Sequence, residues 1–461
     1  MLIPIENTGG TVRRVCYQGD VGVHQAKAIW GTLEMLKEQK ISLKDIEDLT
    51  LRERVEYFAK GYAKGATAYI SDKNAESEIK DLNYMLYVVS QKRMIDNEGW
   101  TPIVDYMAKI SSSSKFNFNE ISEIYTKGRM WSLEYFESIY KLLGTKFSDN
   151  GYYFESETGE YGYKIVSENI KNGIFVKDQG AVIFPGKNYG LHNRVFINSQ
   201  DLPTYEAKEL GLAIKKYDDW AYDISYIITA NEISEYFKVL LKSLSLINPD
   251  LAIKTNHIAH GVMKLTSGKM SSRTGKVVPA TELIQEVKSV IEKKMIDKNR
   301  LSPDGIANLA VSNIKFSILK TATGKNIVFN PEADTSVDGD TSAYVNYTYA
   351  RCAVLVNAST DMTMHDSTSL GATTSISDDG KIVFDLMTRC ADAVEQATTN
   401  LEPHHLVHYL LDLSRAFNVL YSKERILDGN NIDFNIKVCQ EMTRILDFSS
   451  KLLGFKLENR M

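Results

Sequence analysis

A loop at residues 260–279 restricts what this chain can be more than any other stretch. A strand-like apolar approach enters the loop, and a helix-prone sequence follows it. Gly268 and Gly275 let the backbone bend sharply at the two ends. Between these glycines, Lys269 and Arg273 supply fixed positive charge beside several hydroxyl and backbone donors. Such donors are suited to hold a polyphosphate and to stabilise charge that develops on it.

A solvated basic surface loop is the alternative interpretation of this run. The order Lys-Met-Ser-Ser-Arg-Thr-Gly, which begins at Lys269, favours phosphate binding because it resembles the Lys-Met-Ser-Lys-Ser loop with which class I aminoacyl-tRNA synthetases hold ATP. The resemblance implies that Lys269 and Arg273 carry the catalytic contacts to the triphosphate. The implied ATP-binding set is His260, Gly268, Lys269, Met270, Ser271, Ser272 and Arg273.

Length, charge and cysteine usage limit the class of protein. A chain of 461 residues can form two or three domains with separate cores. The net charge of −5 argues against a uniformly basic nucleic-acid coat, although a local basic groove on an acidic body can still bind tRNA. The four cysteines are scattered without a Cys-x-x-Cys pair, which argues against a disulfide framework and a structural zinc site.

The chain contains no apolar run of transmembrane length, and its beginning lacks a signal-peptide pattern. We therefore expect a cytoplasmic protein with no membrane partner, and we expect a monomer.

The beginning of the chain predicts a strand, a glycine-rich turn and a helix. Residues 11–17 alternate like a strand, and apolar residues recur at helical spacing over residues 25–37. In a doubly wound sheet, ligands bind at the carboxyl ends of the strands. Asp20 and His24 fall at such an end and are candidates for substrate binding. A helix-capping role for Asp20 is an equal alternative.

The next segments predict packing rather than chemistry. Residues 40–145 read mostly as helices, whereas residues 150–200 read as β-like and rich in turns. A strand is expected over residues 152–156, before strands near 180–185 and 194–197.

Tyr205 and Glu209 open a predicted helix and stand four residues apart. That spacing places a phenol and a carboxylate on one face of the helix. The pair suits a guanidinium group, which a carboxylate binds by charge-assisted hydrogen bonds and an aromatic ring binds by stacking. By itself, a Tyr/Glu pair at this spacing is usually a surface coincidence.

Two further regions complete the expected fold. Residues 223–229 read as a buried parallel strand, and Glu232 follows it where a ligand would lie. Residues 342–461 read as a helical bundle in which aromatic side chains alternate with a basic one near Tyr347 and Arg351. Exposed residues of these types can stack on unpaired RNA bases.

Three histidines, His404, His405 and His408, suggest a metal site. No further ligand at a suitable spacing accompanies them in the sequence. We therefore interpret them as a surface cluster at the start of a helix and expect no metal site.

Taken together, these stretches resemble arginyl-tRNA synthetase over nearly the whole chain. The similar segments are 15–24, 28–31, 62–66, 132–136, 153–156, 204–209, 347–351, 416–418 and 459–461. The resemblance implies ATP-dependent activation of L-arginine, with Mg²⁺, and its transfer to tRNA(Arg). It implies an arginine-binding set of Asp20, His24, Tyr205, Glu209 and Glu232, and a tRNA-binding set of Tyr347, Arg351 and Asn418.

The resemblance also implies an α/β fold with two parts. We expect a Rossmann-type catalytic domain of class I synthetases over residues 1–285, with an inserted segment around 70–200. Connecting helices would follow over 286–340, and an all-α anticodon-binding domain over 341–461.

Three departures from the family pattern stand out. The acidic residue at Glu209 is commonly Asp, and the Asn231-Glu232 pair differs from the family's usual acidic residue and Gln. The His-Ile-Gly-His motif of the first strand-to-helix turn is absent, since residues 257–260 carry Ala in place of Gly and are expected to form a strand. The chain is therefore expected to be a synthetase shortened at its N-terminus. The alternatives are a non-catalytic tRNA-binding remnant and, with less support, a synthetase for another amino acid.

Overall fold

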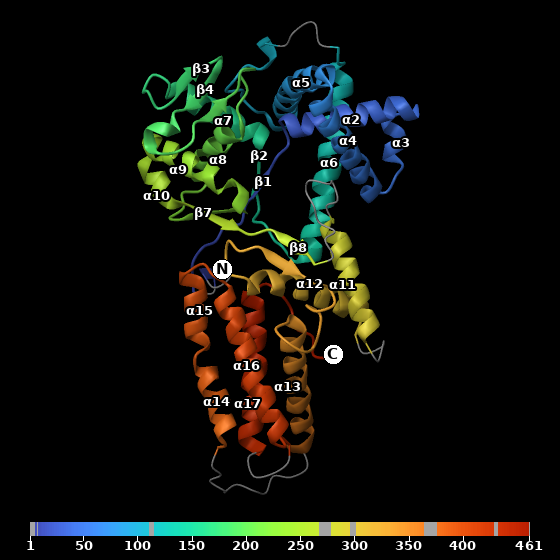
Figure 1. The fold of residues 1–461 in the computed structure, drawn as a ribbon, viewed down its shortest axis with the longest axis vertical. Helices are drawn as coiled ribbons and strands as arrows, with labels where there is room; N and C mark the ends of the chain where they lie inside the picture. The colour runs from blue at the N-terminus through green and yellow to red at the C-terminus, as the bar shows by residue number, and fades with distance from the viewer. Residues whose placement is uncertain are drawn as a thin grey trace. The chain divides into compact units, whose positions relative to one another are not determined.

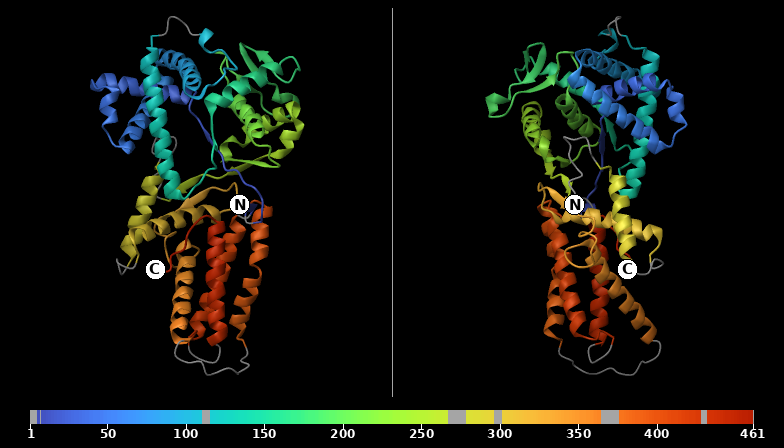
Figure 2. Two further views of the ribbon diagram at one scale, coloured as in Figure 1. Left: turned by 180° about the vertical axis from the view of Figure 1, so that it is seen from behind. Right: turned by 45° about the vertical axis from the view of Figure 1, so that its right-hand side comes forward.

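The computed structural model describes residues 5–6, 8–109, 115–266, 278–295, 301–363, 376–427 and 432–460. The chain divides into two compact units (Figures 1 and 2). One unit comprises Arg13–Ala259, and the other comprises Met1–Val12 with His260–Met461.

A helical lobe forms the first part of the unit Arg13–Ala259. Its helices are α2 (Val23–Gln39), α3 (Leu43–Glu47), α4 (Leu51–Ser71), α5 (Lys73–Glu98) and α6 (Phe118–Leu143), with a 3₁₀ turn η1 (Met107–Lys109). Thr50 and Glu53 form a capping box that starts α4. Helices α2 and α4 approach closely at Gly31. A Cβ on this residue would lie only 1.9 Å from the carbonyl oxygen of Gly61, so a glycine is needed there.

Strand–helix units form the second part of this unit. They comprise β1 (Cys16–Gln18), β2 (Tyr152–Phe154), α7 (Glu155–Glu168), β3 (Val176–Asp178), β4 (Ala181–Phe184), η2 (Gly186–Tyr189), β5 (Arg194–Ile197), α8 (Tyr205–Asp219), β6 (Ser225–Ala230), η3 (Asn231–Ile233), α9 (Ser234–Ile247), α10 (Pro249–Lys254) and β7 (Thr255–His260). Strand β1 pairs with β2 in parallel, and β3, β4 and β5 form an antiparallel sheet. Strand β6 pairs with β7.

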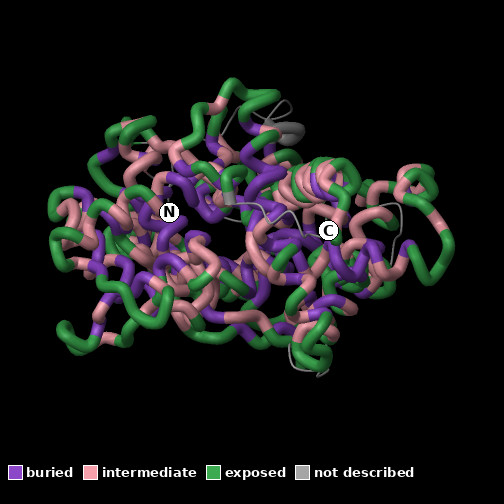
Figure 3. The backbone as a smooth tube through the Cα atoms, turned by 90° about the horizontal axis from the view of Figure 1, so that it is seen from above, coloured by how far each residue is buried: buried purple, intermediate pink, exposed green. Residues whose placement is uncertain are grey.

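The second unit is mainly a helical bundle. It contains β8 (Met263–Leu265), α11 (Ala280–Lys294), α12 (Pro303–Lys320), β9 (Ile327–Phe329), α13 (Ser342–Thr363), α14 (Asp378–Thr388), α15 (Cys390–Thr399), α16 (His404–Lys423) and α17 (Ile432–Leu452). Strands β8 and β9 pair in parallel. A single apolar cluster that includes Leu410, Phe417 and Met442 holds α13 to α17 together. In Figure 3 the exposed stretches lie mostly toward the outside and alternate with buried ones along the chain.

The helices predicted over residues 25–37 and within 40–145 recur as α2 to α6, but three strand predictions need correction. Of the strand predicted over residues 11–17, only Cys16 and Tyr17 lie in β1. Residues 155–168 form α7, although the whole of 150–200 was expected to be β-like. The strand expected over 152–156 ends at Phe154, where α7 begins. Helix α7 is stabilised by packing on α8, and this contact cannot be read from the local sequence. Strand β6 was expected to be buried, yet Ile228 is 59% exposed, so this strand is not a fully covered core strand within the unit.

Among the described residues, no helix is both long enough and apolar enough to span a bilayer.

Candidate active site

Two parallel strands bring the candidate site residues to one edge. In the β1–β2 pair, Gln18 is opposite Phe154, so both strands end at the same level. The turn after β1 begins at Gly19, and Glu155 follows β2 as the first residue of α7. A Cβ on Gly19 would lie 3.3 Å from Oε1 of Glu155, which shows how closely the two strand ends approach. This edge is where ligands of parallel sheets bind.

Helix α8 reaches the same edge because it packs tightly on α7. A Cβ on Gly162 of α7 would lie 1.8 Å from the carbonyl oxygen of Ala207, and one on Gly211 of α8 would lie 2.1 Å from that of Thr158. Only glycine allows the two backbones to come so close. The contact brings residues 207–211 of α8, among them Glu209, against residues 158–162 of α7. Sequence reasoning did not single out these glycines.

Glu209 is a buried carboxylate with an unused acceptor. The residue is 3% exposed, and no donor among the described residues reaches its Oε2 atom. Burial raises the pKa of Glu209 to about 7, against the opposing influence of a hydrogen bond from Tyr205 and the charge of Lys216. A buried acceptor of this kind is costly unless a donor or cation meets it. A positively charged donor is the kind of group that would satisfy this oxygen.

Aromatic rings surround this carboxylate. The ring of Tyr205 lies 5.1 Å from that of Tyr236 on α9, measured between centroids. Burial, and then the charges of Glu209 and Glu155, raise the pKa of Tyr17 on β1, whose hydroxyl is 2.7 Å from Oγ1 of Thr158. A planar cation could both stack on such rings and bind the carboxylate.

A second carboxylate of the site is already paired. Nζ of Lys208 donates to Oε2 of Glu155 at 2.7 Å and to the carbonyl oxygen of Val21 at 3.4 Å. Burial opposes the charge of Lys208, but Tyr87 and Glu155 outweigh it and raise the pKa of this lysine. The charge of Glu155 is thus balanced by Lys208 of the same chain. Of these two carboxylates, Glu209 is the one with an oxygen that no donor among the described residues reaches.

Lys216 is a second buried cation, about two turns further along α8 than Lys208. Its Nζ donates to Oγ of Ser225 at 2.8 Å, and burial lowers its pKa to about 8 despite the favourable charge of Glu209. Lys216 therefore contributes a weaker positive charge near Glu209 than an ordinary lysine would.

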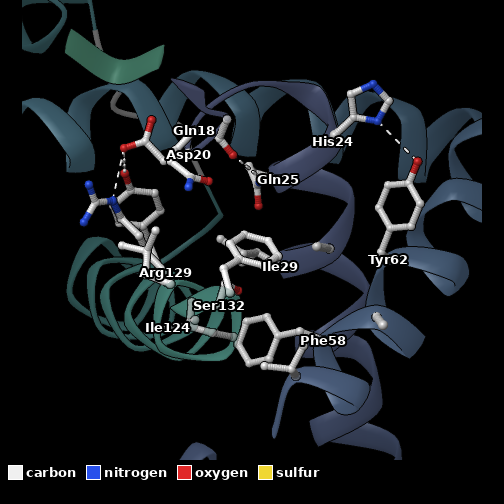
Figure 4. A pocket seen from close by; sticks show the side chains of 18 of the residues that line it. Gln18, Asp20, His24, Gln25, Ile29, Phe58, Tyr62, Ile124, Arg129 and Ser132 are labelled. Carbon is white, nitrogen blue, oxygen red and sulfur yellow. Dashed lines mark hydrogen bonds and ion pairs between the residues drawn. The ribbon is translucent and has the colours of Figure 1, made fainter. Parts of the chain in front are cut away.

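Asp20 and His24 line a separate cavity of about 560 Å³ (Figure 4). The Asp20 carboxylate is fully engaged there. It accepts from the backbone N–H and hydroxyl of Ser156 at 2.9 and 2.8 Å, from Tyr125 at 3.3 Å and from Nε of Arg129 at 3.1 Å. Asp20 therefore ties α6 and α7 to the turn after β1. The alternative role of Asp20 as a helix cap is wrong, because the N-cap of α2 is Gly22.

His24 lies at the opposite side of this cavity from Arg129 in Figure 4. Its Nδ1 atom is 3.3 Å from the hydroxyl of Tyr62 on α4. Burial, and then the charge of Lys27, lower the pKa of His24. The residues that line the cavity include neither Tyr205 nor Glu209, so the predicted arginine-binding set falls at two places.

The remaining predicted ligands are dispersed. Glu232 is exposed in η3, directly after β6. His260 is the exposed last residue of β7, and its Nδ1 lies 2.8 Å from the carbonyl oxygen of Gly261. The strand predicted over 257–260 is confirmed. The loop residues Gly268, Lys269, Met270, Ser271, Ser272 and Arg273 lie outside the described part of the chain.

The predicted tRNA-binding residues meet in the bundle. Nη1 of Arg351 donates to Oδ1 of Asn418 at 2.8 Å, which joins α13 to α16. The same guanidinium donates to the hydroxyl of Tyr347 and lies 4.0 Å from the ring centroid of Tyr421. Tyr347 is 38% exposed, so this arginine–tyrosine cluster presents a ring to solvent.

Comparisons with known proteins give the class of this protein. A family model for the class I (R) tRNA synthetase catalytic domain matches residues 61–330, more than half of the chain, and a model for the DALR anticodon binding domain matches residues 345–461. A catalytic domain followed by such a helical domain defines a class I aminoacyl-tRNA synthetase fold. Within that class the chain belongs to the (R) family, that of the arginyl-tRNA synthetases, which confirms the resemblance and the fold class predicted from the sequence.

Several curated relatives are arginine–tRNA ligases. That of Flavobacterium psychrophilum is 28% identical over 345 residues, which are 72% of this chain and 56% of the relative. That of Bacteroides fragilis is 24% identical over 422 residues, which are 87% of this chain and 70% of the relative. The chain thus spans little more than half the length of the first of these proteins.

Solved structures share the fold. The chain superposes on an arginyl-tRNA synthetase of Thermus thermophilus with a TM-score of 0.68 at 17% identity, covering 99% of this chain and 77% of that one. The Plasmodium falciparum arginyl-tRNA synthetase gives a TM-score of 0.60 at 16% identity, covering 82% and 67%.

Proposed function

We propose that this chain is an arginine–tRNA ligase. It would use ATP with Mg²⁺ to activate L-arginine and would then pass the arginyl group to tRNA(Arg). In the first step the carboxylate of arginine attacks the α-phosphorus of ATP, so that arginyl-adenylate forms and pyrophosphate leaves. In the second step a hydroxyl of the terminal ribose of the tRNA takes the arginyl group and AMP leaves. Positioning and electrostatic stabilisation would supply the catalysis.

The Oε2 atom of Glu209, which no donor among the described residues reaches, carries this proposal. A guanidinium is planar, permanently charged and rich in donors, so it can bind this carboxylate while stacking against the ring of Tyr205. Substrates with a neutral or apolar side chain would leave the buried carboxylate unsatisfied. The family membership and the names of the relatives support arginine as that cation.

The other predicted contacts enter as parts of the same proposal. Lys269 and Arg273 would hold the triphosphate, and His260 with the rest of that loop would complete the ATP site. Asp20 would act by positioning, because its carboxylate already accepts from Ser156, Tyr125 and Arg129. Tyr347, Arg351 and Asn418 would contact tRNA(Arg). The proposal retains the expected monomer, which light scattering would check.

The test is arginine-dependent ATP–pyrophosphate exchange by this chain with tRNA(Arg) present. We expect exchange with arginine and none above background with citrulline, whose urea group replaces the guanidinium. Glu209→Gln should reduce kcat/KM for arginine by about a hundredfold, since a charged hydrogen bond contributes roughly 1.5–3 kcal/mol. Glu235→Gln is the matched control, because that carboxylate is exposed on α9. Exchange that is absent while tRNA(Arg) still binds would establish the tRNA-binding remnant instead.

A further inference from the structure

Three metal-binding side chains gather at the turn between α15 and α16. Glu402 lies in the turn, and His404 and His405 begin α16. One ligand atom of each residue lies within 4.8 Å of those of the other two. The sequence spacing of the histidines alone suggested no third ligand, because Glu402 precedes a proline and joins the set only through the shape of the turn.

The separations fit one small cation. Oε2 of Glu402 is 3.0 Å from Nε2 of His405 and 4.0 Å from Nε2 of His404. Tetrahedral zinc with bonds of about 2.0–2.1 Å requires its ligand atoms to be about 3.4 Å apart. The two measured separations lie on either side of this spacing.

The turn that carries these residues is held firmly. Leu401 adopts a left-handed φ of 57°, and its carbonyl oxygen accepts from Oγ1 of Thr323 at 3.4 Å. The backbone N–H of Glu402 donates to the carbonyl oxygen of Ala397 at 3.0 Å, which closes the end of α15. The carbonyl end of α15 favours a nearby cation and offsets the opposite influence of the amide end of α16.

The three side chains are also accessible to an ion. Their exposed fractions are 17% for His404, 27% for His405 and 36% for Glu402, so solvent can supply a remaining ligand. The Nδ1 atom of His404 is buried and meets no acceptor among the described residues.

We propose that Glu402, His404 and His405 bind one divalent transition-metal ion of the zinc class, which clasps the α15–α16 turn. Two imidazoles with one carboxylate suit Zn²⁺, and Co²⁺ binds to the same kind of site. His408 stands outside the set, since its ring centroid is 6.0 Å from that of His404 and it is not among the clustered ligands. This ion would be structural, and the proposal is independent of the ligase activity.

Calorimetric titration of the untagged chain with Zn²⁺ tests the proposal. We expect one saturable site per chain and a higher Tm with Zn²⁺ than without it. Glu402→Gln keeps the shape of the side chain, and His405→Gln keeps a polar group. Each should weaken Zn²⁺ binding about tenfold or more and abolish the shift in Tm. His408→Gln, a histidine one turn away, should bind as the wild type does.

Three results would overturn it. Zn²⁺ affinity unchanged in Glu402→Gln would place the ion elsewhere, as would thiolate charge-transfer bands in the visible and ultraviolet spectrum of the Co²⁺ form. The absence of saturable binding to the wild type would leave the contact between His405 and Glu402 as an ordinary hydrogen bond. Circular dichroism of each variant shows that a loss of binding is not a loss of fold.

Discussion

At the scale of one residue, Glu209 shows how a group proposed to bind a ligand can lower the stability of the free protein. Its carboxyl group is almost fully buried and one oxygen has no partner among the described residues. Natural proteins retain such costly groups where a ligand completes them. The free protein should therefore gain stability when this charge is removed, while losing its affinity for arginine.

The pH dependence of stability follows from the same residue. The pKa of Glu209 rises from 4.5 to about 7 on folding, so between these values the folded state binds more protons than the unfolded state. Stability contributed by this carboxyl group is present below pH 4.5 and is lost as the pH rises through 7. The loss is on the order of 3 kcal/mol. Glu209→Gln should consequently be more stable than the wild type at pH 7.5 and lose that advantage in acid.

Urea denaturation at a series of pH values, without arginine, measures this effect. Glu235→Gln provides the control, since the exposed Glu235 loses no buried charge on substitution. An advantage of Glu209→Gln that stays constant with pH would show that the carboxyl group does not titrate as its burial requires.

At the scale of the elements, the glycine contact between α7 and α8 determines where Glu155 and Glu209 lie. Both helices begin at the strand-end edge, and their axes are close because Gly162 and Gly211 have no side chain. Without this contact the first turn of α8 would lie farther from Glu155. The geometry of the site thus depends on residues that touch no ligand.

Gly211→Ala should destabilise the chain by about 1–3 kcal/mol, because its Cβ would lie 2.1 Å from the carbonyl oxygen of Thr158. Gly305→Ala is the matched control, since Gly305 is also helical and its Cβ would meet nothing closer than 3.4 Å. Thermal unfolding compares the two variants. If Gly211→Ala were as stable as the control, α7 and α8 could not be as close as the structure places them.

At the scale of the whole molecule, the two units carry different parts of the proposed function. The proposed guanidinium site lies in the unit Arg13–Ala259, and the cluster of Arg351 with Tyr347, Asn418 and Tyr421 lies in the other unit. Binding of arginine and binding of tRNA should therefore respond to different substitutions.

Arg351→Ala should weaken tRNA(Arg) binding by roughly 5- to 150-fold, because a lost stacking contact with a base costs about 1–3 kcal/mol. The variant removes the cation that orients Tyr347 and Tyr421. Filter binding at fixed salt measures the affinity, and the KM for arginine at saturating tRNA should not change. Arg444→Ala on the exposed side of α17 is the control for general charge loss. Equal weakening by both variants would mean that this cluster contributes only charge.

Local chemistry in the sequence was sufficient to predict several features. Helix periodicity, the pairing of Tyr205 with Glu209 and the basic-aromatic pattern around Arg351 are encoded within a few residues of one another, so they can be read directly. The family and the class of fold followed from the order of such motifs, and the family matches confirm both. The individual roles of the site residues stay predictions.

Long-range packing decided the rest, because it depends on residues far apart in the chain. Helix α7 was missed since its stability comes from α8, and the pairing of Lys208 with Glu155 joins two elements. Only the folded chain shows that the Asp20 carboxylate is occupied by Ser156, Tyr125 and Arg129. The sequence thus determined which chemical groups this protein carries, and tertiary packing decided which of them remain available, because burial and partners are set by contacts between distant segments.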